Sequence, residues 1–126
     1  MKVLLVDDSK TMRNIQKKVL ESLGGAEFTE AGDGLEALTA IAANAAGFNI
    51  ILVDWNMPNM DGLTLVTKIR EKDKKTPVIM VTTEAEKTRV VDAIKAGVNN
   101  YVIKPFTPPQ LLEKVTATLE KLKAAA

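Results

Sequence analysis

The sequence predicts an α/β fold in which one parallel β-sheet is covered by helices on both faces. Five short apolar runs alternate with five longer segments whose apolar residues recur every three or four positions. The short runs are almost continuously apolar, which is typical of parallel strands buried on both faces. The chain has 126 residues, enough for one domain that buries its own core. We therefore expect a single domain, residues 1–126, built from five consecutive strand–helix units.

The expected strands are short runs of aliphatic and β-branched residues that end at polar or turn-forming residues. They cover 3–6, 28–31, 50–53, 78–81 and 101–103. The run at 28–31 has the weakest pattern, so we expect that strand near an edge of the sheet. Right-handed crossovers place the carboxyl ends of all parallel strands at one edge of the sheet.

The expected helices show apolar residues at helical spacing. In chain order, these are Met12, Ile15, Val19 and Leu23; Leu35, Leu38, Ile41 and Ala45; Leu63, Val66 and Ile69; Val90, Val91 and Ile94; and Leu111, Val115, Leu119 and Leu122. Asp33 with Glu36, and Thr107 with Gln110, have the spacing of capping boxes at helix starts. The glycines expected to end helices are Gly24 with Gly25, Gly47 and Gly97. The final alanines, 124–126, are expected to fray.

The composition excludes several classes of function. The formal net charge is +1, which gives no reason to expect nucleic acid or an anionic membrane as the main partner. Cysteine and histidine are absent, which excludes disulfides, thiolate metal sites, most zinc sites and histidine-dependent nucleophiles. No apolar run approaches the roughly 18 residues of a membrane span, and the first residues lack a signal-peptide pattern. We therefore expect a cytoplasmic protein.

Polar residues that could carry chemistry follow four of the expected strands. Asp7 and Asp8 follow the first strand, Asp54 the third, Thr82 the fourth and Lys104 the fifth. Each also has a purely structural interpretation as a helix cap, a solvated turn residue or a surface lysine. The candidate caps are Asp8 or Ser9 for the first helix and Thr82 or Thr83 for the fourth. The coincidence of these residues at the edge where open α/β sheets bind ligands favours a functional site.

If the first and third strands are neighbours, the carboxylates of Asp7, Asp8 and Asp54 converge. Clustered carboxylates repel one another unless a cation lies among them. Oxygen ligands without histidine or cysteine favour Mg²⁺, which commonly shares its site with a phosphate. An ionised aspartate needs no general base to attack phosphorus. Lys104 and the metal would neutralise the transferred group, and Thr82 would donate a hydrogen bond to it, so the residues indicate phosphoryl transfer onto a carboxylate.

Several sequence segments together resemble a known family. They are 5–9 (LVDDS), 54–62 (DWNMPNMDG), 81–82 (VT), 96–97 (AG) and 101–107 (YVIKPFT). These segments span essentially the whole chain, and their order and spacing match the family. On these segments the sequence resembles the receiver domain of two-component response regulators, and among them the CheY-like chemotaxis response regulators. The resemblance implies a flavodoxin-like (βα)5 three-layer sandwich whose strands are ordered 2-1-3-4-5.

The resemblance implies a magnesium-dependent phosphorylation site. Asp54 is expected to be the phosphoryl acceptor. The metal ligands are expected to be Asp7, Asp8, Asp54 and the backbone carbonyl of Asn56. The protein would then be a signalling phosphoprotein rather than an enzyme, with intrinsic autophosphorylation and autodephosphorylation.

The resemblance also implies a conformational switch. Thr82 and Lys104 are expected to contact the phosphoryl group, and Tyr101 is expected to move inward when Thr82 is drawn to that group. The peptide bond between Lys104 and Pro105 is expected to be cis, which is otherwise the minority state before proline.

Four residues around the expected site bear on how it is tuned. Asn56 and Glu84 match the choices of CheY-like proteins at two positions that adjust self-hydrolysis, which indicates a short-lived phosphorylated state. Trp55 also matches CheY-like proteins. Its purely structural interpretation is a partly buried packing residue, but we expect it to lie beside the site and to report on it. Thr83 departs from the family pattern, in which a small residue often follows the switch threonine, and we expect its side chain to narrow access to the phosphate.

A receiver without an output domain must signal through its own surface. The resemblance implies a CheA-like histidine kinase as phosphoryl donor and a flagellar motor switch protein, or another target, as the partner. The target is expected on the face of the fourth helix, fifth strand and fifth helix, centred on Tyr101. Further residues expected there are Lys87, Val90, Ile103 and Lys114. We expect a monomer that binds neither nucleic acid nor a membrane.

Three other functions remain open from the sequence. A phosphorelay intermediate, which passes its phosphoryl group to a histidine phosphotransfer protein, would have the same acceptor site. A phosphatase of the haloacid dehalogenase type also attacks with an aspartate, but the second aspartate of that class is replaced by Asn56 here. A flavodoxin-like cofactor binder would share the fold. A dinucleotide or Walker site is disfavoured because no glycine-rich loop follows the first strand.

Overall fold

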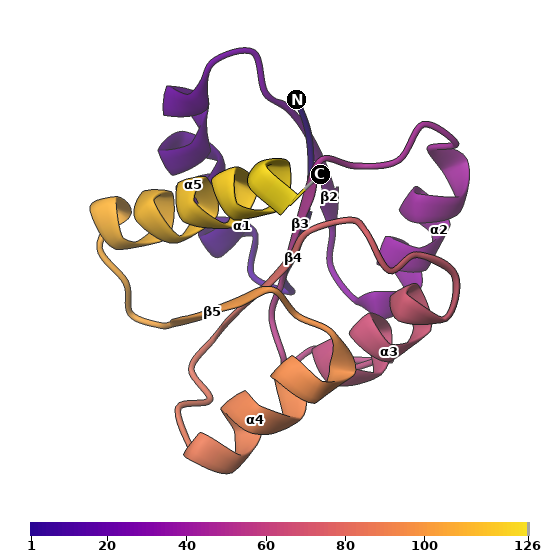
Figure 1. Cartoon of the computed structure of the whole chain (residues 1–126). Helices are drawn as coiled ribbons and strands as arrows, with labels where there is room; N and C mark the ends of the chain where they lie inside the picture. Colours follow the sequence, from indigo (N-terminus) through magenta and orange to yellow (C-terminus); the bar gives the residue numbers. More distant parts are fainter. Residues whose placement is uncertain (126) are drawn as a thin grey trace.

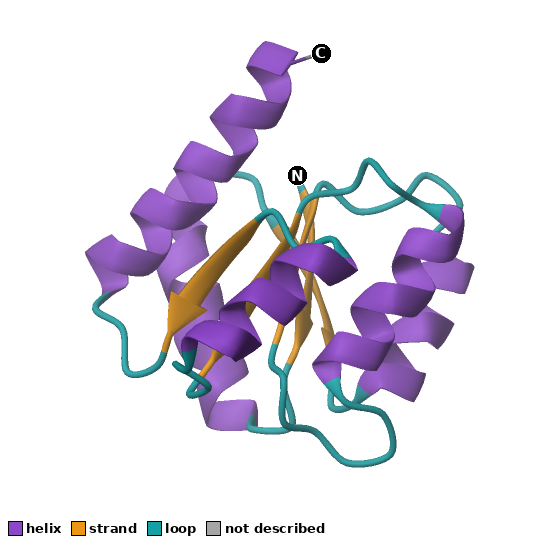
Figure 2. Cartoon of the chain, turned by 60° about the horizontal axis from the view of Figure 1, so that its bottom comes forward, coloured by secondary structure: helices purple, strands orange, loops and turns teal. Residues whose placement is uncertain are grey.

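A computed structural model describes residues 1–125, with side chains up to residue 122. It shows three layers, in which a central parallel sheet lies between two layers of helices (Figure 1). Figure 2 shows the helices on both sides of the strands. The α/β architecture expected from the sequence is therefore confirmed. The expected fraying of the last alanines stays a prediction, because residue 126 lies outside the described residues.

The sheet contains five parallel strands within residues 1–125. These are β1 (Lys2–Val6), β2 (Glu27–Ala31), β3 (Ile50–Val53), β4 (Val78–Thr82) and β5 (Asn100–Ile103). Their spatial order is β2-β1-β3-β4-β5. This order confirms the one implied by the resemblance and places β2 at an edge, as its weak pattern predicted. Each strand agrees with its predicted range to within one residue at either end.

The helices form two groups on opposite faces of the sheet. Their bounds are α1 (Lys10–Leu20), α2 (Gly34–Ala43), α3 (Gly62–Lys72), α4 (Lys87–Ala96) and α5 (Pro108–Ala125). Helices α1 and α5 contact each other on one face, while α2, α3 and α4 form a row on the other (Figure 1). A short 3₁₀ helix, Glu21–Leu23, follows α1.

The alternation of side chains along each strand divides the core into two halves. Leu4 and Ile51 belong to the half that contains Leu65 of α3. Leu5 belongs to the half that contains Leu111 of α5. Because both faces are covered, almost every residue of the inner strands is apolar, which explains why the strands were readily predicted.

The caps of α1 and α4 resolve two of the structural interpretations considered above. Ser9 Oγ accepts a hydrogen bond from the amide of Met12 at 3.2 Å, so Ser9 caps α1 and Asp8 does not. Helix α4 begins after Glu86, several residues beyond the two threonines that follow Val81. Neither threonine therefore caps α4, and Asp8 and both threonines are free for other roles.

One predicted capping box is confirmed and the other is shifted by one residue. The amide of Thr107 donates to Gln110 Oε1 at 2.8 Å, and the amide of Gln110 donates to Thr107 Oγ1 at 3.3 Å. Asp33 Oδ1 accepts from the amide of Glu36 at 2.8 Å, as predicted. Glu36 Oε1, however, accepts from the amide of Gly32 at 3.0 Å instead of the amide of the capping residue.

Two predicted helix ends are wrong by a few residues. Helix α1 ends at Leu20, because the chain tightens into the 3₁₀ turn that continues to Leu23. Helix α2 ends at Ala43, before the predicted Gly47, because the next residue leaves helical geometry. Helix α4 ends as predicted at Gly97, whose φ of 116° favours glycine.

Several apolar residues on the predicted helix faces are exposed. Ile15, Leu35, Val91 and Ile94 are 41%, 51%, 39% and 57% exposed. On α1, Gln16 is buried beside the exposed isoleucine. A helical period identifies an apolar stripe, but the rotation of the helix on the sheet decides which residues of that stripe are covered.

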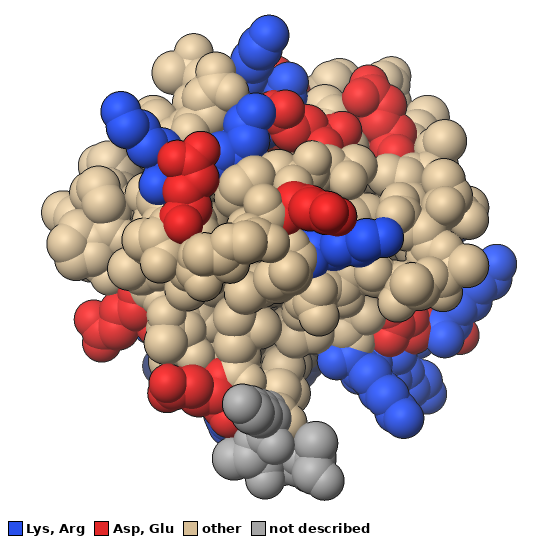
Figure 3. All heavy atoms as spheres, turned by 90° about the horizontal axis from the view of Figure 1, so that it is seen from above, with Lys and Arg blue, Asp and Glu red and all other residues tan. Residues whose placement is uncertain are grey.

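Two observations describe the hydropathy of the helices and the charge of the surface. Within residues 1–125, no helix is long and apolar enough to cross a membrane. Figure 3 shows basic and acidic side chains interspersed over one face of the molecule. This mixture agrees with the small net charge of +1.

Candidate functional site

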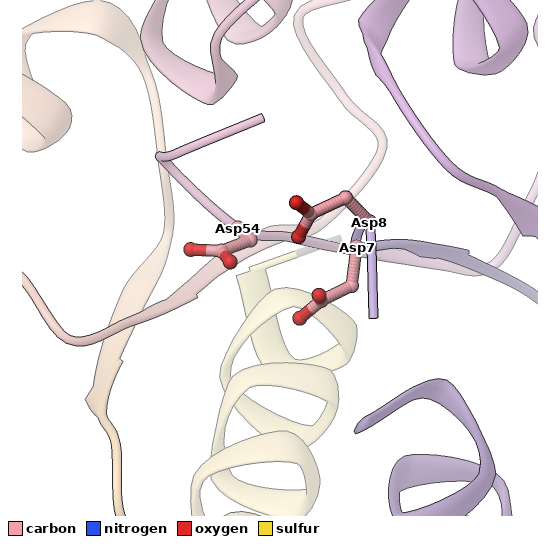
Figure 4. A group of neighbouring side chains, drawn as sticks. All are labelled: Asp7, Asp8 and Asp54. Carbon is pink, nitrogen blue, oxygen red and sulfur yellow. The ribbon is translucent and has the colours of Figure 1, made fainter. Parts of the chain in front are cut away.

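The candidate site lies at the carboxyl edge of the sheet, where β1 and β3 end side by side. Val6 and Val53 are paired in the parallel register, so the residues that follow them are neighbours. The amide of Asp54 donates to the carbonyl of Val6 at 2.9 Å and extends this pairing by one residue. Figure 4 shows the side chains of Asp7, Asp8 and Asp54 gathered at the ends of the two strands.

The three carboxylates are close enough to share one metal ion. One oxygen from each of Asp7, Asp8 and Asp54 lies within 4.8 Å of the others. Asp7 and Asp54 are buried, whereas Asp8 is exposed. An all-oxygen donor set that opens to solvent on one side fits a partly hydrated, hard divalent cation. The acidic cluster predicted from the sequence is therefore confirmed as a group that could hold a metal ion.

Lys104 reaches this cluster from the end of β5. Its ammonium donates to Asp7 Oδ2 at 2.7 Å and to Asp54 Oδ2 at 3.1 Å. All three side chains are nearly covered, at 12%, 1% and 10% exposed, so these contacts are shielded from bulk water. The peptide bond between Lys104 and Pro105 is cis, as predicted. One lysine thus joins the carboxylates that end two different strands.

Burial and ion pairing act in opposite directions on these groups. Burial raises the pKa of Asp7 above its usual value, although hydrogen bonds from Lys104 and the Ser9 amide partly offset this effect. Burial alone would lower the pKa of Lys104, but its hydrogen bond to Asp7 and the negative charge of Asp54 raise it overall. Lys104 is therefore charged at neutral pH and can neutralise negative charge at the site.

A single residue connects Thr82 with Tyr101. Thr82 is fully buried, and its Oγ1 accepts from the amide of Glu84 at 3.4 Å. The carbonyl of Glu84 accepts from the hydroxyl of the half-buried Tyr101 at 2.6 Å. Burial, followed by the charge of Glu84, raises the pKa of Tyr101 to about 12, so its hydroxyl is a donor at neutral pH. The backbone of Glu84 therefore lies between the two residues expected to form the switch.

The residues that flank the site include a pair and a covered aromatic ring. Asn56 Nδ2 donates to Glu84 Oε1 at 3.1 Å in an exposed contact. Trp55 is 3% exposed, and the guanidinium carbon of Arg89 lies 5.1 Å from its ring centroid. Trp55 is therefore more fully buried than its purely structural interpretation supposed. Thr83 is exposed directly after β4.

Sequence reasoning missed the roles of two residues that shape the site. A Cβ on Gly62 would lie 2.1 Å from the carbonyl oxygen of Asp54, so a side chain there would displace the strand end. Arg13 of α1 donates to the carbonyl of Asp7 and, at 3.0 Å, to Glu30 Oε1. Gly62 is the last residue of the segment 54–62, which was singled out from the sequence. No sequence signal indicates the contact of Arg13, because this contact joins a helix to the end of a strand.

Comparison with known proteins shows the family to which the chain belongs. The family described as the response regulator receiver domain matches residues 3–116. The chain belongs to this receiver family. The matched residues include β1 from Val3 onward, the other four strands and the acidic cluster, together with the lysine and threonine beside it. A response regulator receiver is a signalling protein, so the expectation that this chain is a signalling protein is confirmed.

Among receivers, the chain is similar to the CheY group. It is 50% identical to chemotaxis protein CheY1 of Helicobacter pylori, over 94% of this chain and 97% of the relative. It is 44% identical to chemotaxis protein CheY-3 of Vibrio cholerae, over 97% of this chain and 94% of the relative. The crystal structure of a CheY-like receiver domain protein from Methanospirillum hungatei aligns with a TM-score of 0.88 at 31% identity, covering 99% and 98% of the two chains. The resemblance to CheY-like receivers is therefore confirmed.

Proposed function

We propose that this receiver accepts a phosphoryl group on Asp54 and that phosphorylation changes its affinity for a partner protein. The observation that carries the proposal is the position of Lys104, whose ammonium contacts both Asp7 and Asp54. A fixed cation beside a carboxylate nucleophile is suited to neutralising a transferred phosphoryl group. Membership of the receiver family supports the same role.

The proposed chemistry is a single phosphoryl transfer. A carboxylate oxygen of Asp54 forms a bond to phosphorus while the bond between phosphorus and the histidine nitrogen of the donor breaks, which leaves an acyl phosphate on the receiver. Ionised Asp54 needs no general base for this step. Mg²⁺, held by Asp7, Asp8, Asp54 and the backbone carbonyl of Asn56, would neutralise charge on the phosphoryl oxygens. The ammonium of Lys104 would give up one of its hydrogen bonds to a carboxylate and donate instead to a phosphoryl oxygen.

The proposed switch begins at Thr82. Its hydroxyl reaches a phosphoryl oxygen by moving toward Asp54, and this movement releases the amide of Glu84. The carbonyl of Glu84 accepts the hydrogen bond of Tyr101, so the displacement is passed to β5. Coupling between two sites in such switches is typically about 1–3 kcal/mol, which changes partner affinity about 5–150-fold.

The proposed output surface lies on α4, β5 and α5. Its large apolar residues Val91, Ile94 and Ile103 are 39%, 57% and 45% exposed. A cavity of about 410 Å³ that includes Ile103 is lined by residues of β5, of the loop that follows it and of the first turns of α5, among them Tyr101, Phe106, Gln110 and Lys114. Contiguous exposed apolar side chains with a polar rim are typical of protein interaction sites.

We propose a chemotaxis role because the two relatives described above are chemotaxis proteins. In this role, residues 1–126 act as one receiver domain in the cytoplasm, a CheA-like histidine kinase is the donor, and a flagellar motor switch protein binds the output surface. A monomer is sufficient for these contacts, since the donor site and the output surface are both on one chain.

Mass spectrometry after incubation with a phosphorylated CheA-type kinase and Mg²⁺ tests the acceptor. We expect the wild-type protein to gain the mass of one phosphoryl group and Asp54→Asn to gain none. Asp61→Asn, which alters an exposed carboxylate at the start of α3, is the matched control and should be phosphorylated normally. Equal phosphorylation of Asp54→Asn and wild type would overturn the assignment.

The switch is tested separately with Thr82→Ala. This variant should still be phosphorylated on Asp54, but the ratio of partner affinities with and without the phosphoryl mimic beryllofluoride should shrink toward one. A ratio equal to that of wild type would show that the signal does not pass through the threonine.

A further inference from the structure

The loop between β3 and α3 carries residues next to the acceptor and is held on both sides by neighbouring loops. We propose that Asp33 and Asn59 are positioning residues that hold this loop in the geometry required for metal binding. The inference rests on the proposed function, because it concerns the backbone carbonyl of Asn56 as a metal ligand. Neither residue touches the acidic cluster, so they act through the loop between them.

Asp33 uses both carboxylate oxygens in this arrangement. Its Oδ1 accepts from the amide of Glu36 and caps α2, while its Oδ2 accepts from Asn59 Nδ2 at 2.7 Å. Asp33 is 7% exposed, so this second contact lies largely outside bulk water. The two hydrogen bonds lower the pKa of Asp33, which keeps the carboxylate ionised at neutral pH. A helix cap would require only one of these oxygens.

Asn59 occupies an unusual backbone conformation at the tip of the loop. Its φ is 66°, in the left-handed region that few residues other than glycine adopt, although asparagine tolerates it. The neighbouring Met60 packs against Gly34 so closely that a Cβ on this glycine would lie 2.8 Å from the methionine side chain. The loop tip is thus joined to the start of α2 by one charged hydrogen bond and one close packing contact.

Two other hydrogen bonds hold the end and the outer side of the loop, and its tip at Asn59 is held by the hydrogen bond to Asp33. At its end, the amide of Gly62 donates to the carbonyl of Trp55 at 2.8 Å. On its outer side, Asn56 is held by the exposed hydrogen bond to Glu84. Asn59 lies three residues after Asn56 and three before Gly62, so neither of these contacts holds the tip directly. Loss of the Asp33–Asn59 hydrogen bond would let the segment sample other conformations, and metal binding would then have to restore the binding geometry.

Three variants test this proposal in the full chain. Asn59→Gly removes the amide but retains a residue that favours positive φ. Asp33→Ser keeps a capping oxygen for α2 but removes the second carboxylate oxygen. We expect each variant to weaken Mg²⁺ binding about tenfold, as is common when a residue supporting a metal ligand is lost. The double variant should be no weaker than either single variant, because both remove the same hydrogen bond.

Mg²⁺ affinity is measured by isothermal titration calorimetry, and Trp55 fluorescence gives a second readout. Thr39→Gly is the control, because Thr39 lies on the exposed side of α2 and this change lowers stability without touching the loop. It should leave Mg²⁺ affinity unchanged. Variants that lose stability but bind Mg²⁺ like wild type would overturn the positioning role and leave the proposed function intact. Failure of the wild-type protein to bind Mg²⁺ would overturn both.

Discussion

Helices α3 and α4 are neighbours of similar length, yet they are held in very different ways. Helix α3 buries Leu65, Val66 and Ile69 against the sheet and begins with a side-chain cap from Asp61. Helix α4 buries only Ala93 fully and leaves Val91 and Ile94 39% and 57% exposed. Within the described residues, the side chain at its N-cap makes no capping hydrogen bond.

Because of this difference, we expect α3 to stay fixed and α4 to move more easily when neighbouring residues are displaced. Helix α3 follows the loop that begins at Asp54, so its tight packing restrains that end of the loop. Helix α4 follows Thr82 and Glu84, and segments with few buried apolar contacts open at a lower free energy than core elements. We infer that a small displacement at the end of β4 is more readily passed to α4 than to α3.

The largest expected effect is the difference in stability lost when an apolar side chain is truncated on each of the two helices. Leu65→Ala creates a cavity at a fully buried position of α3 and should lower the free energy of unfolding by about 2–5 kcal/mol. Ile94→Ala removes a side chain that is 57% exposed on α4 and should change it by no more than about 0.5 kcal/mol. Urea unfolding monitored by circular dichroism measures both. Similar losses in the two variants would contradict the comparison.

A second prediction concerns the start of α3. Gly62→Ala should lower the free energy of unfolding by about 1–3 kcal/mol, because the new Cβ would overlap the carbonyl oxygen of Asp54. Gly32→Ala is the control, since its Cβ would make only an ordinary contact of 3.5 Å with Glu36. If both alanines are tolerated equally in urea unfolding, the close approach of Gly62 to Asp54 is not structurally required.

A third prediction uses pH to test the anchor at the far end of α3. The amides of Lys75 and Thr76 donate to Asp73 Oδ1 at 2.9 and 3.0 Å. Burial raises the pKa of Asp73, but hydrogen bonds from Thr76 and Lys75 outweigh burial and bring the pKa below its usual 3.8. At neutral pH, Asp73→Ala should therefore cost about 1–2 kcal/mol of stability.

The pH dependence of this loss has a definite sign. Because the folded-state pKa of Asp73 is the lower one, its stabilisation is present above pH 3.8 and is lost as the pH falls through the folded-state value. The difference between Asp73→Ala and wild type should therefore shrink as urea titrations are repeated at successively lower pH. A difference that stays constant down to the acid transition would show that the hydrogen bonds do not require the charged form.

The smallest expected effect is a change that would make the start of α4 resemble the capped start of α3. Glu86→Ser supplies the capping side chain that this N-cap lacks and should stabilise α4 locally by about 1 kcal/mol. Amide hydrogen exchange of α4 should slow, with Glu86→Ala as the control that adds no cap. Unchanged exchange in the serine variant would mean that the helix start does not limit the local stability of α4.

The helices show where sequence reasoning about the fold reaches its limit. The inner strands β1, β3 and β4 were predicted to within one residue because both of their faces are buried and nearly every position must be apolar. The exposed Ile15 and Leu35 were placed on the covered faces, since a helical period indicates a stripe and not its rotation. The helix ends at Leu20 and Ala43 were missed because local turns preceded the glycines expected to end these helices.

For the site, the residue types were predicted and their partners were not. Asp7, Asp8 and Asp54 were expected together because parallel strands end at one edge, and they do lie together. The hydrogen bonds from Lys104 to two of them could not be derived, since the direction of a long side chain depends on all its neighbours. Their expected roles in metal binding and phosphoryl transfer stay predictions.

The sequence by itself determined the α/β class, the strands and the edge at which the polar residues gather, because these depend on apolar periodicity and on the handedness of the chain. The resemblance to receivers added the strand order. Only the tertiary structure decided that Asp33 holds Asn59, that Glu84 links Thr82 with Tyr101, and that α4 stays mostly exposed. These features depend on contacts between loops and helices from different units, and such contacts leave no periodic pattern in the chain.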